Sequence, residues 1–168
     1  MPVSSRVDPA SAGGPLVDST GAVIGVTARL DGGYATPPDT TGAIGPEHYV
    51  EMVNSAVGVY DRSTLASPPI AKMTLSQFVS AAFGCDPQIQ WDQHSGRWIY
   101  VVLECSAGFG DNSLHFGWSK TADPADLVNG WCKFELPSGI LFEDYPKMGH
   151  SANHMIVGTN VFNQREDR

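Results

Sequence analysis

The feature that most constrains the fold is a series of short apolar segments, each closed by turn-forming residues. The segments are rich in Val, Ile, Tyr and Trp and are bounded by Gly, Pro, Asn or Asp, a pattern typical of strands joined by tight turns. We expect strand pairs at 48–53 with 56–60, 88–91 with 97–104, and 113–119 with 130–136, followed by a strand at 154–162. Only residues 75–83 and 124–128 favour short helical turns. The sequence therefore predicts an all-β fold.

An aspartate recurs ahead of three of these strands. Asp39, Asp86 and Asp144 precede the strand centres at residues 52, 98 and 155 by 13, 12 and 11 residues. The intervals between the aspartates, 47 and 58 residues, are near the ~40–50-residue period of propeller blades. A plain β-sandwich would show similar strands but gives no reason for an aspartate before each one.

If the aspartates mark repeated blades, the three carboxylates should lie at one end of the structure. They would then serve either to cap backbone amides of their own turns or to hold a calcium ion through oxygen ligands. The sequence favours capping, because further oxygen donors for calcium are not evident. Asp39, Asp86 and Asp144 are therefore candidate ligand-binding residues and weak calcium candidates.

Residues 37–162 resemble a group of exported bacterial β-propeller proteins, mostly of unassigned function and related to the sialidase-like class. The matching blocks are PPDTTGAIGPEHYVEMVNSAVGVYDRST, CDPQIQWDQHSGRW, SKTADP, FEDYPKMG and GTNVF, in that order. The resemblance implies a partial β-propeller over 37–168, with two to three blades' worth of strands, as a fragment of a larger ring. It further implies an extracellular or periplasmic binding or scaffold module with no self-contained active site.

The resemblance leaves a second interpretation open, a fragment of a sialidase-like glycoside hydrolase. Those enzymes use an arginine cluster and a tyrosine nucleophile with a carboxylate partner. Arg29, Arg62 and Arg97 are too few and too scattered to assemble the cluster from this sequence. We therefore name no catalytic residue, and expect the ligand, a glycan or a protein, to be bound without reaction.

Residues 7–26 resemble the nucleophile-segment hairpin of HtrA-type, trypsin-like serine proteases. Ala12 stands where that family has its serine, and Ala10 replaces a glycine of the oxyanion site. A methyl group cannot attack a carbonyl, and only eleven residues precede Ala12 to supply a base. Residues 1–36 are therefore expected to be a loose segment plus a hairpin, either extra strands or the remnant of a fused, inactive protease module.

Tryptophans divide into two groups. We expect Trp98 and Trp131 in the core, with residues 101 and 156 also pointing inward, whereas Trp91 and Trp118 are candidate ligand-binding residues that could stack on sugar rings. The segment 149–153 resembles a nucleophile elbow without its last glycine and is interpreted as a polar loop. His150 and His154 lack a third ligand, so no zinc site is predicted there.

Charge and composition exclude several partners. The net charge is −8, with 10 Lys and Arg against 18 Asp and Glu, and without a basic run the chain is not expected to bind nucleic acid. No apolar run reaches the ~18 residues of a membrane span, and no signal peptide is visible.

Cys85, Cys105 and Cys132 leave at least one thiol unpaired. An exported chain could form one disulfide, and buried thiols are the alternative. No cofactor is expected apart from the calcium already considered.

Overall fold

The computed structural model describes residues 15–17, 23–26, 39–63, 68–105 and 112–163. Within these ranges the chain forms twelve strands and one short helix, so the all-β prediction is confirmed. Strand β1 (Pro15–Val17) pairs with β2 (Val23–Val26) in an antiparallel hairpin inside the 1–36 segment. The remaining residues of that segment, with Ala10 and Ala12, lie outside the described ranges.

The first large sheet is a four-stranded antiparallel meander in which each strand pairs with the next in sequence. Its strands are β3 (Thr41–Ile44), β4 (His48–Val53), β5 (Ala56–Asp61) and β6 (Ala71–Thr74). Helix α1 (Leu75–Val79) follows directly, because the Thr74 hydroxyl accepts a hydrogen bond from the backbone N–H of Gln77 and caps its first turn. Leu75 and Phe78 on this helix are buried.

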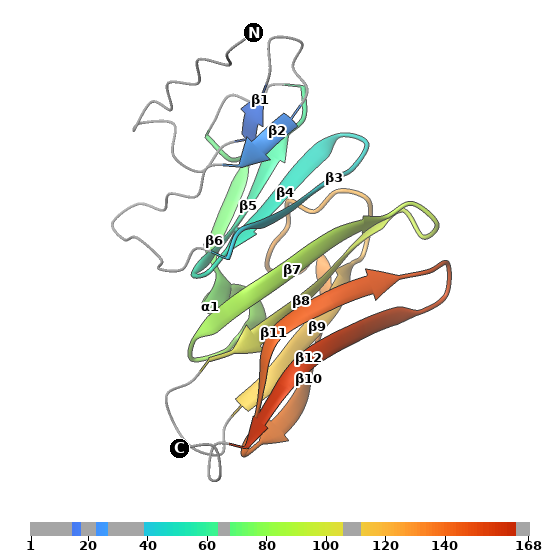
Figure 1. Cartoon of the computed structure of the whole chain (residues 1–168). Coiled ribbons are helices and arrows are strands. Elements are labelled where there is room, and N and C mark those ends of the chain that lie inside the picture. Colours follow the sequence, from blue (N-terminus) through green and yellow to red (C-terminus); the bar gives the residue numbers. More distant parts are fainter. Residues whose placement is uncertain (1–14, 18–22, 27–38, 64–67, 106–111, 164–168) are drawn as a thin grey trace, which may run out of the picture.

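The second large sheet repeats the same meander. Its strands are β7 (Gly84–Asp92), β8 (Arg97–Glu104), β9 (Asn112–Ser119) and β10 (Trp131–Gly139). A third sheet consists of the long hairpin β11 (Leu141–His150) and β12 (Met155–Asn163). Strand β7 contacts both β3 and β11, so the first strands of the three sheets lie next to one another (Figure 1).

Two apolar clusters separate the sheets. The first fills the space between the β3–β6 and β7–β10 sheets and includes α1. Its fully enclosed members are Val50, Met52, Val57, Val59, Leu75, Phe78, Trp98, Tyr100 and Val102. The second lies between the β7–β10 sheet and the β11–β12 hairpin. It consists of Cys85, Ile99, Val101, Leu103, Leu114 and Met148. Trp98, Trp131 and Val101 are therefore buried as expected.

Ile156 is a correction, because its side chain is 70% exposed. Strand β12 touches the second sheet with one face only, and Met155 and Val157 occupy that face. Ile156 alternates with them and points to the opposite side. Three strands, β3, β6 and β11, were also absent from the sequence prediction. The helical turn expected at 124–128 is a single turn at residues 127–129, closed by a hydrogen bond from the Gly130 N–H to the Asp126 carbonyl, and not a helix.

Candidate functional site

The recurrent aspartates lie at the beginning of the first strands of the sheets. Asp39 lies two residues before the first residue of β3, whereas Asp86 and Asp144 lie inside β7 and β11 next to register shifts. Asp39 and Asp86 have positive φ angles of 41° and 47°, and in the third sheet this conformation falls on Tyr145, at 53°. Left-handed backbone at a bulge bends a strand, and in β7 and β11 it lies at the register shifts beside Asp86 and Asp144.

Hydrogen bonds connect these positions from sheet to sheet. The Asn54 side-chain amide, in the β4–β5 turn, donates to Asp39 Oδ2 at 2.6 Å and accepts from the Asp86 backbone N–H at 2.6 Å. The Tyr145 backbone N–H donates to Asp86 Oδ2 at 3.3 Å. The bonds seen for Asp39 and Asp86 therefore reach other strands and sheets, and differ in this from the expected capping of their own turns. We call this set the aspartate relay.

The aspartate relay brings negatively charged side chains close together. Burial raises the pKa of the Asp86 carboxyl, and the nearby carboxylates of Asp39 and Asp144 raise it further, against the opposing hydrogen bond from Tyr145 N–H. The structure thus brings together the three carboxylates, whereas calcium binding by them stays a prediction.

The two candidate tryptophans face different surroundings. Trp91 packs edge-on against Trp98, with ring centroids 5.1 Å apart, and belongs to the apolar contact between the first two sheets. Gly45 is required there, because a Cβ atom at this position would lie 2.6 Å from the Trp98 ring. Trp118 lies on the opposite face of the second sheet, tilted against Phe134 at 4.9 Å. Trp118 borders a pocket.

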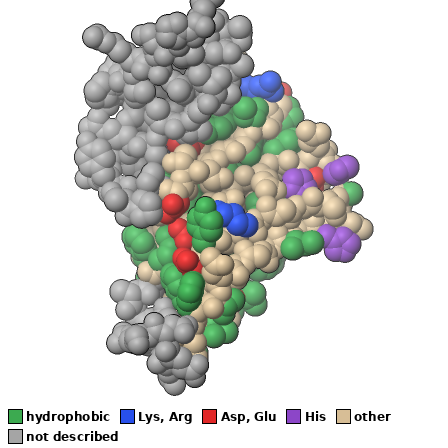
Figure 2. All heavy atoms as spheres, viewed as in Figure 1, with side chains coloured by type: hydrophobic (Ala, Val, Ile, Leu, Met, Phe, Trp, Pro, Cys, Tyr) green, Lys and Arg blue, Asp and Glu red, His purple; other side chains and the backbone are tan. Residues whose placement is uncertain are grey.

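That pocket has a volume of about 270 Å³ and lies between the β7–β8 and β11–β12 hairpins. We call it the hairpin pocket. It is lined by Asp92, Ser95, Arg97, Ile99, Trp118, His150, Ser151, Ala152, Asn153, His154 and Met155. Figure 2 shows histidine side chains gathered at the end of the molecule where these two hairpin turns lie. The 149–153 segment is thus the end of β11 and its turn, in agreement with the polar-loop interpretation.

His150 is held at the mouth of the hairpin pocket from two sides. Its Nδ1 lies 2.7 Å from Gln90 Oε1, and its Nε2 lies 3.6 Å from Asp92 Oδ1. The Gln90 amide nitrogen donates to the Met148 carbonyl, which turns the amide oxygen toward the imidazole. Both ring nitrogens therefore face oxygen atoms of neighbouring side chains.

Asp92 is the only carboxylate among the residues that line this pocket. Its side chain accepts hydrogen bonds from the Ser95 hydroxyl at 2.6 Å and from the His94 backbone N–H at 2.9 Å. The Ser95 hydroxyl, these amides and the nearby His150 lower the pKa of the Asp92 carboxyl. Asp92 therefore stays ionised at neutral pH and is suited to accept hydrogen bonds from a ligand.

Both described arginines are committed to backbone carbonyls. Arg97 donates to the carbonyls of Ser119 and Lys120, and Arg62 donates to those of Gly45 and Pro46. Arg29 lies outside the described residues. Within the described ranges, the structure therefore does not bring arginines together into the cluster of a sialidase-like enzyme.

Two further features of the described residues bear on chemistry. A disulfide joins Cys85 in β7 to Cys105 just after β8, with Cα atoms 5.9 Å apart, and Cys132 keeps a free thiol. On the first sheet, the Glu51 carboxyl is 4% exposed, and burial raises its pKa to about 7. The Tyr60 hydroxyl interacts with this carboxyl, but not with the geometry of a full hydrogen bond.

Of the residues that line the pocket, the sequence analysis named Trp118 as a binding candidate, and it missed Asp92 for a definable reason. Asp92 and His150 lie in different sheets, and no local pattern indicates that their hairpins meet.

Within the described part of the chain, no helix combines the length and the apolar character that crossing a membrane requires. The chain matches no protein-family model, no curated protein and no solved structure.

Proposed function

We propose that residues 37–168 form part of a β-propeller that acts as a ligand-binding module. Support comes from two consecutive four-stranded meanders followed by a hairpin, with the first strands β3, β7 and β11 adjacent. The aspartate relay joins these first strands in the order of the chain. In this interpretation each sheet is a blade and the third blade is represented by two strands.

The observation that carries the binding role is the position of Trp118 in the hairpin pocket beside Asp92, His150 and Asn153. An indole face offers a flat apolar surface, and the other three side chains offer hydrogen-bond donors and acceptors around it. A sugar ring needs both, because its C–H face is apolar and its hydroxyls must be hydrogen-bonded once they leave water. The ligand class is therefore a glycan.

Hydrolysis of that glycan has less support. A glycoside hydrolase needs two carboxyl groups about 5–10 Å apart, one of them able to donate a proton. The hairpin pocket offers Asp92 alone, with its pKa lowered. Binding without reaction is consequently the function we infer.

An exported protein fits the disulfide between Cys85 and Cys105. Such bonds persist in oxidising compartments and are rare in the cytosol. The location we propose is therefore extracellular or periplasmic.

The test is a titration of the chain with neutral and N-acetylated mono- and oligosaccharides, followed by tryptophan fluorescence and by calorimetry. We expect at least one sugar to bind and to change the emission. Trp118→Ala should weaken binding about tenfold or more, which corresponds to the loss of about 1.4 kcal/mol. Asn153→Ala, at an exposed position of the same pocket, should weaken binding without disturbing the core.

The matched control is Phe83→Ala, which removes an aromatic ring that is 51% exposed and does not line the pocket. This variant should bind like the wild type. Failure of every sugar to bind would refute the proposal, and so would equal affinities in the wild type, Trp118→Ala and Asn153→Ala.

A further inference from the structure

Away from the hairpin pocket, three potential metal ligands meet on one face of the second sheet. Glu104 ends β8, His115 lies in β9, and Glu135 lies in β10 directly opposite His115. One ligand atom from each side chain lies within 4.8 Å of the others. The sequence prediction missed this set, because its members come from three strands and have no recognisable spacing.

The distance between the imidazole and the nearer carboxylate is informative. His115 Nε2 lies 3.4 Å from Glu104 Oε2, longer than the usual hydrogen bond of 2.7–3.2 Å. It equals the edge expected between two ligands of one tetrahedral zinc ion with bonds of 2.0–2.1 Å, which is about 3.3–3.4 Å. The two side chains form a long hydrogen bond or ion pair, and the same spacing fits two ligands of one zinc ion.

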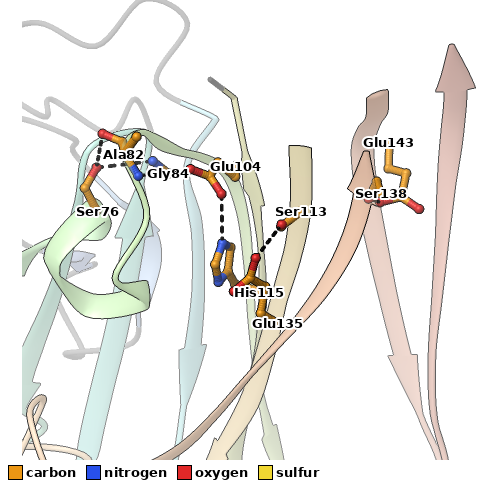
Figure 3. A network of polar contacts seen from close by, with 9 residues as sticks. All are labelled: Ser76, Ala82, Gly84, Glu104, Ser113, His115, Glu135, Ser138 and Glu143. Atoms are coloured by element: carbon orange, nitrogen blue, oxygen red, sulfur yellow. Dashed lines mark hydrogen bonds and ion pairs between the residues drawn. The ribbon is translucent and has the colours of Figure 1, made fainter. Parts of the chain in front are cut away.

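Neighbouring groups hold the two carboxylates in place (Figure 3). The Ala82 backbone N–H donates to Glu104 Oε1 at 3.0 Å, and the Ser113 hydroxyl donates to Glu135 Oε1 at 2.7 Å. Each carboxylate is thus oriented by a hydrogen bond to one of its two oxygens. Outer hydrogen bonds of this kind orient metal ligands.

Burial differs among the three ligands in a way that suits an accessible site. The His115 side chain is 5% exposed and that of Glu104 is 13% exposed, whereas Glu135 is exposed. Two ligands are therefore fixed by packing, and the third leaves a path to solvent.

We infer that Glu104, His115 and Glu135 form a three-ligand site for a divalent transition-metal ion, with zinc as the fitting example. One imidazole nitrogen and two carboxylate oxygens are ligands that zinc accepts, and three protein ligands leave a fourth position for water. Calcium and magnesium prefer sites made of oxygen only, so the histidine disfavours them. This inference is independent of glycan binding at the hairpin pocket.

The experiment is calorimetric titration of the chelator-treated chain with Zn²⁺, with Ca²⁺ and Mg²⁺ as comparison ions. We expect one zinc ion per chain, bound more tightly than either comparison ion. Glu135→Gln should weaken zinc binding at least about tenfold. Because Glu135 is exposed, this variant should keep the fold, whereas His115→Ala alters a buried position.

The matched control is Glu143→Gln. Glu143 also accepts a hydrogen bond from a serine hydroxyl, that of Ser138, but is not part of the ligand cluster (Figure 3). It should bind zinc like the wild type. Cys132→Ser and His154→Ala should also leave zinc binding unchanged, since a free thiol and an exposed imidazole are alternative zinc ligands outside the cluster.

Two results would overturn the inference. The first is the absence of a stoichiometric zinc event. The second is an adventitious ion only, recognised by equal zinc affinities in the wild type and Glu135→Gln, or by loss of binding in Cys132→Ser or His154→Ala. Cobalt absorption gives a second readout. Because Glu135 is one of the proposed ligands, the visible absorption of bound Co²⁺ should lose intensity in Glu135→Gln but not in Glu143→Gln.

Discussion

The second sheet packs against its two neighbours in different ways. Toward β3–β6 it presents Trp98, Tyr100 and Val102, which are fully buried and meet the apolar face of the first sheet and helix α1. Toward β11–β12 it presents Ile99, Val101 and Leu103, but this contact ends in the hairpin pocket with Asp92 and His150. At the hairpin turns the first interface is filled by apolar side chains, whereas the second opens there into a polar pocket.

This difference separates stability from binding. Burial of apolar surface contributes roughly 25 cal/mol per Å², so a filled contact stabilises and leaves no room for a ligand. At the hairpin turns, Trp91 and Gly45 fill the first interface, whereas the corresponding part of the second remains open. One face of the second sheet thus packs into a core, and the opposite face borders a candidate site.

The largest expected effect comes from breaking the apolar interface. Trp98→Ala removes a fully buried ring and its hydrogen bond to the Ala122 carbonyl. Such truncations cost about 3–5 kcal/mol, which lowers the melting temperature of a domain of this size by on the order of 10 °C. Thermal unfolding followed by circular dichroism measures the change. A shift of only a degree or two would mean that this contact is not the main source of stability.

An intermediate effect should appear on the opposite face of the first sheet, where a carboxyl is buried instead of a ring. Because the folded-state pKa of Glu51, about 7, exceeds the ordinary value of 4.5, the folded chain keeps a proton that the unfolded chain loses. Stability from this group is therefore full below pH 4.5 and declines by about 3 kcal/mol as the pH rises to 7.

Urea unfolding at pH 4.5 and pH 8 measures this decline. Glu51→Gln should remove most of it, whereas Glu47→Gln, at an exposed position, should retain it. If both variants show the wild-type dependence on pH, the carboxyl of Glu51 is ionised in the folded chain and the interpretation of its burial is wrong.

The smallest effect should separate the two faces of the β11–β12 hairpin. Met148→Ala opens the second apolar cluster and should cost about 2 kcal/mol, at the low end for such truncations because this cluster is small. Ile156→Ala, on the open face, should change stability by less than about 0.5 kcal/mol. Denaturant midpoints of the two variants decide the point, and equal losses would show that both faces of the hairpin are covered.

Alternation along single strands made part of this fold predictable from the sequence. Trp98 and Val101 lie in a run of β-type residues after a clear turn, and both are buried as expected. Strand β11 was missed because Pro146 and the register shift between Asp144 and Lys147 interrupt its pattern. Ile156 was misplaced because the sequence does not say which face of a hairpin another sheet covers.

Some residues of the candidate sites could also be predicted from the sequence, and others could not. Asp39, Asp86 and Asp144 each precede a strand by a similar number of residues. This spacing relates different sheets to one another, so the common position of the three aspartates could be inferred from it alone. Trp118 was a candidate for its residue type alone, and Trp91, chosen on the same ground, packs in the core contact. Asp92 and Glu135 have no such signal, since their partners are set by the packing of hairpins and by strand register.

The aspartate relay has a direction. In each of its three hydrogen bonds the donor comes later in the chain than the acceptor: Asn54 to Asp39, Asp86 to Asn54, and Tyr145 to Asp86. The side that donates therefore differs from the side that accepts, which is the property of a heterologous, head-to-tail contact. Two copies related by a two-fold axis would place acceptor against acceptor. To extend the relay, a further sheet must follow in the same head-to-tail orientation and place a backbone N–H against a carboxylate, as Tyr145 does against Asp86.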